Sequence, residues 1–117
     1  MNVEELREYA LSLPYTSEGF PFDETTLVIK AGSKMFILFD IESKPLAMNV
    51  KCDPEEAILL RDTYSFVLPG YHMNKKHWNT IIIDGRSTES QIKTWVKDSY
   101  NLVFKSLTKK EKSELGE

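Results

Sequence analysis

One acid-free segment brings together most of the residue types that could recognise an anion. Residues 69–80 contain two adjacent lysines, both histidines of the chain, and several amide and aromatic side chains. Lysine neutralises phosphate, amides donate hydrogen bonds to phosphate oxygens, and an exposed aromatic face can stack on a base. The segment therefore predicts a binding surface for nucleic acid or another anion, with the following candidate residues: Tyr71, His72, Asn74, Lys75, Lys76, His77 and Trp78.

The same segment also fits a purely structural role. Large aromatic side chains are mostly buried in folded proteins, and lysines are mostly exposed. In that interpretation the tyrosine and the tryptophan belong to the core, and the two lysines form a solvated turn between strands. A nucleic-acid surface would also need cations from elsewhere in the chain, for which the candidates are Lys30, Lys34, Lys93 and Lys97.

Other chemistries find less support in the sequence. The separation of five residues between His72 and His77 places them on opposite faces of a strand and far apart around a helix, which disfavours a shared metal ion. Cys52 precedes a helix start, where a thiol pKa can fall, but its position at the end of an apolar strand favours inert packing. The chain has no glycine-rich phosphate loop and no serine-nucleophile motif. We therefore predict a non-enzymatic protein with no cofactor and no metal ion.

The elements that must position these residues follow from apolar spacing and turn chemistry. Helices are predicted at 3–13, 54–64 and 88–107, and strands at 27–30, 35–39, 46–50, 66–68 and 78–83. Asn2 with Glu5 resembles a capping box, Asp53 followed by proline marks the second helix start, and Gly32 suits a type II′ hairpin turn. Residues 15–26 are predicted to be a loop that anchors two phenylalanines on the domain.

The order helix, three strands, helix, two strands, helix predicts an α+β fold. We expect a single domain over residues 1–108, with a mostly antiparallel sheet of about five strands backed by helices. Residues 109–117 are charged and lack an apolar partner, so they are predicted to form a frayed tail.

Ser99 falls on the apolar face of the last helix, so its hydroxyl is expected to bond to the helix or to a sheet group. Asp98 is expected to reach a histidine or a lysine across the helix–sheet interface.

Charge and hydropathy limit the class of protein. The net charge is −3, and residues 1–29 contain six acidic residues against one arginine, whereas residues 63–83 contain two lysines and no acid. This distribution excludes indiscriminate coating of nucleic acid and permits a small, oriented contact. No apolar run approaches the length of a membrane span, no signal peptide is present, and the single cysteine forms no internal disulfide. We expect a cytoplasmic monomer with no membrane partner.

Several stretches resemble the MmcQ/YjbR family of small bacterial proteins. The matching sequences are KCDPE at 51–55, PGYHMNKKHWNT at 69–80 and DSYNLV at 98–103, and FPF at 20–22 and KMF at 34–36 also fit. The resemblance covers nearly the whole chain and implies an α+β fold like that of the CyaY/frataxin superfamily. The family is commonly labelled DNA-binding, so the resemblance implies DNA as a partner. It transfers no catalytic residue to this chain.

Two functional hypotheses follow, with a third behind them. The first is a DNA-binding protein whose lysines, histidines and Asn74 contact the phosphate backbone. The second is a protein-interaction module, or a module for a small anionic ligand, in which Tyr71, His72 and Trp78 line a pocket. An exposed Trp78 beside a cleft would favour the second hypothesis, and a Trp78 buried under the last helix would count against it. Iron handling by the acids of the first helix, as in frataxin, ranks third because Glu4, Glu5 and Glu8 are few for that task.

Overall fold

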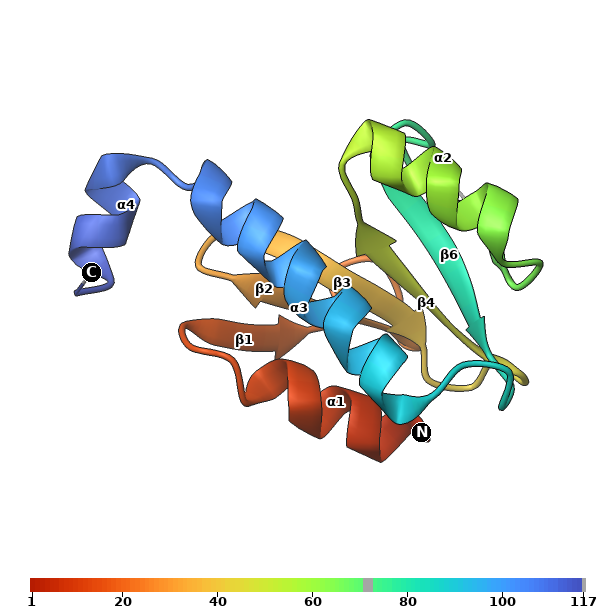
Figure 1. The fold of residues 1–117 in the computed structure, drawn as a ribbon. Helices are drawn as coiled ribbons and strands as arrows, with labels where there is room; N and C mark the ends of the chain where they lie inside the picture. Colours follow the sequence, from red (N-terminus) through yellow and green to blue (C-terminus); the bar gives the residue numbers. More distant parts are fainter. Residues whose placement is uncertain (71–72, 117) are drawn as a thin grey trace.

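The computed structural model describes residues 1–70 and 73–116, and its backbone forms a six-stranded antiparallel sheet with helices on one face (Figure 1). The elements are α1 (Val3–Leu11), β1 (Thr16–Gly19), β2 (Thr26–Ala31), β3 (Lys34–Asp40), β4 (Leu46–Lys51), α2 (Pro54–Thr63), β5 (Val67–Pro69), β6 (Trp78–Ile83), α3 (Glu89–Ser106) and α4 (Lys109–Glu114). The strand order is β1-β2-β3-β4-β6-β5, and every neighbouring pair is antiparallel. The predicted α+β class and the mostly antiparallel sheet are confirmed.

The local signals for helix starts and for the hairpin hold in the structure. Asn2 and Glu5 form the reciprocal capping box of α1, and the Asp53 side chain accepts from the Glu55 N–H at the start of α2. Gly32 has a φ of 58° at the β2–β3 turn, a conformation that glycine adopts without steric cost. These features depend on side chains within a few residues of one another, which is why the sequence alone predicted them.

The predicted loop at 15–26 is wrong in its first part, because residues Thr16–Gly19 form the edge strand β1 and raise the strand count to six. This strand has the sequence TSEG, with no apolar alternation, and it is held by backbone pairing to β2. Phe20 and Phe22 follow the end of this edge strand and are 47% and 65% exposed, so they do not anchor the loop as predicted.

The predicted frayed tail contains a short helix instead. The Thr108 side chain caps α4 by accepting from the Glu111 N–H. The Glu111 carboxylate accepts hydrogen bonds from the Ser33 N–H (2.8 Å) and the Ser33 hydroxyl (2.6 Å). The partner lies 78 residues away in the β2–β3 turn, so no local pattern could have indicated this contact.

The main hydrophobic core lies between the sheet and the helices α1, α2 and α3, which share one face of the sheet (Figure 1). It contains Leu6 of α1, Leu60 of α2 and Val96 of α3 packed against inward-facing strand residues such as Phe39 and Met48. A second, smaller cluster lies on the opposite, helix-free face. Among the described residues, no helix combines the length and the apolar character needed to cross a membrane.

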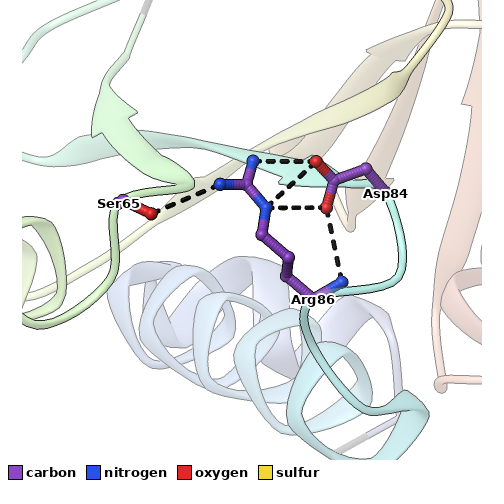
Figure 2. A network of polar contacts seen from close by, with 3 residues as sticks. All are labelled: Ser65, Asp84 and Arg86. Atoms are coloured by element: carbon purple, nitrogen blue, oxygen red, sulfur yellow. Dashed lines mark hydrogen bonds and ion pairs between the residues drawn. The ribbon is translucent and has the colours of Figure 1, made fainter.

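The connection from β6 to α3 is fixed to the start of β5 by an arginine. Figure 2 shows that the Arg86 guanidinium donates to the Asp84 carboxylate and to the Ser65 hydroxyl, at 3.0 Å and 3.3 Å. The same group lies 5.2 Å from the centre of the Phe66 ring. The hydrogen bond from Arg86 lowers the pKa of the Asp84 carboxyl group. These contacts fix where α3 enters the helix layer.

Ser99 of α3 joins two strands at the centre of the sheet. The backbone pairing of β3 with β4 includes Ile37↔Val50, and the next pair along the ladder would be Phe36 and Lys51. In its place, the Ser99 hydroxyl donates to the Phe36 carbonyl (2.6 Å) and accepts from the Lys51 N–H (2.8 Å). The prediction that Ser99 bonds to a sheet group is confirmed.

Replacing Ser99 with alanine should destabilise the protein by about 2–4 kcal/mol, because the buried Phe36 carbonyl and the part-buried Lys51 N–H would lose their shared partner. Chemical denaturation followed by circular dichroism measures the change. Ser90→Ala, at an exposed position of the same helix, is the control and should change stability by less than about 0.5 kcal/mol. A Ser99→Ala effect no larger than that of the control would mean that the strands close the gap themselves.

Replacing Glu111 with alanine should raise the hydrogen-exchange rates of the α4 amides several-fold and leave the core amides unchanged, since only the contact with Ser33 is lost. The hydrogen bonds from Ser33 lower the pKa of Glu111 below its ordinary 4.5. The ionised Glu111 carboxylate therefore stabilises the docked α4 fully above pH 4.5. This stabilisation is lost as the pH falls through the lowered pKa of Glu111 in the folded protein. Lys110→Ala is the matched control, and equal exchange in both variants would contradict a docked α4.

Candidate functional site

Residues 73–77, just before β6, contain a tight turn with the two lysines in it. The Asn74 carbonyl accepts from the N–H groups of Trp78 (2.9 Å) and His77 (3.1 Å), and the Asn74 side chain accepts from the Lys76 N–H (2.9 Å). Asn74, Lys75 and Lys76 are exposed. These backbone bonds hold the turn in one conformation, so the two ammonium groups are presented from a defined support.

Gly70 allows the segment to approach β6 closely. Its N–H donates to the Trp78 carbonyl (2.9 Å), and a Cβ atom at this position would lie 2.8 Å from the Trp78 Cβ. A side chain therefore has no room here, which explains the glycine that precedes the turn.

Trp78 is buried, and its position divides the predicted site. The indole is only 7% exposed and packs with Val28 and Leu38 on the helix-free face, under Met35 and Met73. It is therefore covered from the side opposite to α3, and it offers no exposed face for stacking on a base. Trp78 is thus a core residue, as the structural interpretation of the segment predicted.

The remaining candidates of the segment have different surroundings. His77 is half-buried, and its carbonyl accepts from the Cys52 N–H (2.7 Å), which ties the turn to the end of β4. Tyr71 and His72 lie outside the described residues. The structure thus brings together Asn74, Lys75 and Lys76 as surface groups.

The further cations proposed from the sequence are distributed over both faces of the sheet. Lys30 of β2 is exposed and pairs in register with Met35, which packs against Trp78, so Lys30 shares the helix-free face with the turn. Lys34 instead donates to the Ser106 carbonyl (3.2 Å). Lys93 pairs with Glu89 on α3, and Lys97 lies over the Tyr100 ring. Of these four lysines, only Lys30 lies on the sheet face of the Trp78 cluster.

A polar contact also crosses the helix-free face. The Thr80 hydroxyl donates to the Asn49 side-chain oxygen (2.6 Å), which links β6 to β4 across this face. Glu18 of the edge strand pairs with Arg7 of α1, and it lies in register with Ile29 of the helix-side core.

A groove between α2 and α3 is the other candidate site, and the sequence analysis did not predict it. Its volume is about 560 Å³, with Cys52, Leu60 and Trp95 in its wall. Leu59 on α2 and Leu102 on α3 line its opening and are 57% and 37% exposed. The signal that could have revealed it is the run AILL at 57–60. Four consecutive apolar residues are more than one buried stripe of a helix can accommodate.

The environment of the Cys52 thiol disfavours its thiolate form. Burial, followed by the charges of Glu56 and Asp98, raises the pKa of the thiol to about 11. The Asn79 amide lies 3.9 Å from the sulfur and donates to the Ala57 carbonyl. The predicted inert role of Cys52 agrees with this environment.

Two other expectations concern charged groups. Asp98 lines the groove, and within the described part of the chain it forms no ion pair with a lysine or histidine, contrary to the prediction. The reason is its exposed position on the outer side of α3, away from the sheet. Over the same described residues, no group of three histidine, cysteine or acidic side chains is close enough to hold a metal ion.

Comparison with known proteins agrees with the resemblance noted in the sequence. The family model described as YjbR matches residues 11–102, which include the turn segment and most of α3. The chain belongs to the YjbR family. Protein YbdF of Escherichia coli O157:H7 is 34% identical over 113 residues, covering 96% of this chain and 92% of YbdF. Protein YjbR of Escherichia coli K12 is 36% identical over 101 residues, covering 86% of this chain and 85% of its own.

Solved structures of similar proteins share the fold. The crystal structure of Deinococcus radiodurans protein DR2400 superposes on 98% of this chain with a TM-score of 0.92 and 41% identity, covering 88% of DR2400. A Pseudomonas syringae protein covers 88% of this chain with a TM-score of 0.76 and 25% identity, over 99% of its own length. The names of these YjbR-family relatives and neighbours state no activity, so the chemistry of this chain's own residues has to carry any functional proposal.

At pH 8 the native Cys52 should react with iodoacetamide at least ~100-fold more slowly than the thiol of the denatured chain, because a raised pKa leaves little thiolate. The rate should rise about tenfold per pH unit until the pH approaches the pKa of about 11. Glu56→Gln should accelerate the reaction and Glu55→Gln should not. Native and denatured rates within a factor of about ten would contradict the buried, high-pKa thiol.

Proposed function

We propose that this protein is a non-enzymatic nucleic-acid-binding protein that contacts phosphate groups with the 73–77 turn and the adjoining helix-free sheet face. The observation that supports this most directly is the pair Lys75 and Lys76, which are exposed at the tip of a hydrogen-bonded turn. Among the described residues neither lysine has an acidic partner. Lys30 supplies a third cation on the same face.

The uneven charge of the molecule orients such a contact. The helix layer carries the acids of α1 and of the α2–α3 groove, such as Glu4, Glu8 and Glu56. A polyanion is repelled by these acids and attracted by Lys30, Lys75 and Lys76. The net charge of −3 is therefore compatible with binding in one orientation.

The contact is one of phosphate recognition rather than base recognition. Trp78 is buried beneath Met73, and the exposed groups of the turn are two ammonium groups and an amide. Phosphate contacts position a protein on nucleic acid but carry no sequence information. The proposal therefore entails weak sequence preference and strong salt dependence. It also implies a cytoplasmic location, because the YjbR-family relatives are bacterial and bacterial DNA lies there.

Binding of a fluorescein-labelled duplex of about 20 base pairs should be detectable by anisotropy at about 50 mM salt and should weaken steeply at higher salt. The double variant Lys75→Ala/Lys76→Ala should lose about tenfold in affinity, and its salt slope should fall by about two, one for each lost phosphate contact.

The matched control is Lys109→Ala/Lys110→Ala, which removes another adjacent and exposed lysine pair from α4. It should leave the affinity and the salt slope nearly unchanged. Absence of binding at low salt, or an equal loss in both double variants, would rule out the proposed surface.

A further inference from the structure

The groove between α2 and α3 has the shape of a docking site for an elongated apolar partner. Its wall contains Leu60 and Trp95, and its volume is about 560 Å³. Leu59 and Leu102 stand on its two sides and remain partly exposed to solvent. A partner that rests on both helices would cover them.

The edge of the groove is acidic. Asp53, Glu55, Glu56 and Asp98 line it against Lys51 and Lys105. Within the described residues, none of the four carboxylates takes part in an ion pair. The charges of Glu56 and Asp98 also act on the groove wall, since both raise the pKa of the Cys52 thiol. The groove thus combines an apolar wall with unneutralised negative charge.

We propose that this groove binds an amphipathic helix of a partner protein, with an apolar stripe that enters the groove and lysine or arginine residues that face its acidic edge. Helix-in-groove recognition uses apolar anchors at i, i+3, i+4 and i+7, which match an apolar channel bordered by two helices. The flanking basic residues supply the charges that the groove lacks.

Two other occupants fit the groove less well. A second copy of this chain would offer its own exposed apolar helix surface on α2, where Ile58 and Leu59 stand beside Glu55 and Glu56. Docking that surface would bring like charges together. An anionic ligand would meet the same repulsion. The residues that line the groove include none of the turn at 73–77, so the two proposed sites use different side chains.

The probe is a fluorescein-labelled synthetic peptide of about 18 residues, built from leucine at i, i+3, i+4 and i+7 positions and lysine elsewhere. Anisotropy should show saturable binding, and amide chemical shifts of the labelled protein should change in α2 and α3. A scrambled peptide of the same composition should bind at least about tenfold more weakly, as should a leucine–glutamate peptide with the same spacing.

Matched variants test the apolar and the charged part separately. Leu59→Asp and Glu56→Lys/Asp98→Lys should each reduce affinity at least about tenfold. Their controls are Ile58→Asp, an exposed neighbour outside the groove, and Glu4→Lys/Glu8→Lys on α1, which should bind as the unmodified chain does. All substituted positions are exposed, so folding is expected to persist and is checked by circular dichroism.

Three results would overturn the proposal. One is equal binding of the patterned and scrambled peptides, and another is an equal loss in a groove variant and its control. The third is self-association of the chain that depends on Leu59 in the absence of any peptide binding. DNA binding serves as an independent readout, because Leu59→Asp should leave it unchanged.

Discussion

The Ser99 hydroxyl is the contact on which the arrangement of the molecule most depends. It donates to β3 at Phe36 and accepts from β4 at Lys51, where the backbone ladder between these strands stops. One side chain of α3 therefore fixes the helix against two central strands at once. Beyond this point β4 continues only beside β6 and leads through Cys52 into α2. The position of the groove between α2 and α3 follows from the same contact.

The two sides of the sheet expose different groups. On the helix side, the groove is lined by Asp53, Glu55, Glu56 and Asp98 together with Lys51 and Lys105. On the helix-free side, Trp78 and two methionines form a small apolar cluster beside Lys30 and the lysine turn. The two surfaces use different side chains, although the His77 carbonyl of the turn accepts a hydrogen bond from Cys52 in the groove wall.

Much of the fold was predictable because its signals are local. The caps of α1 and α2, the Gly32 turn and the apolar spacing of α3 depend on residues within one or two turns of chain. The edge strand β1 and the docked α4 were missed because both are held by distant groups. Backbone pairing with β2 holds β1, and Ser33 holds α4 through Glu111. The groove was missed because its walls come from helices far apart in the sequence.

The sequence by itself determined the residue types available for recognition: an acid-free segment with adjacent lysines, an acidic N-terminal part, and four consecutive apolar residues in α2. Only the tertiary structure decided which of them face solvent. Strand alternation directs the Trp78 side chain to the helix-free face, where it joins the small cluster. The hydrogen bonds to Asn74 close the turn, in which Lys75 and Lys76 are exposed to solvent. Packing of α2 beside α3 left Leu59 at an open groove rather than in the core. The burial of a residue depends on the residues that pack against it, and these are brought together only when the whole chain folds.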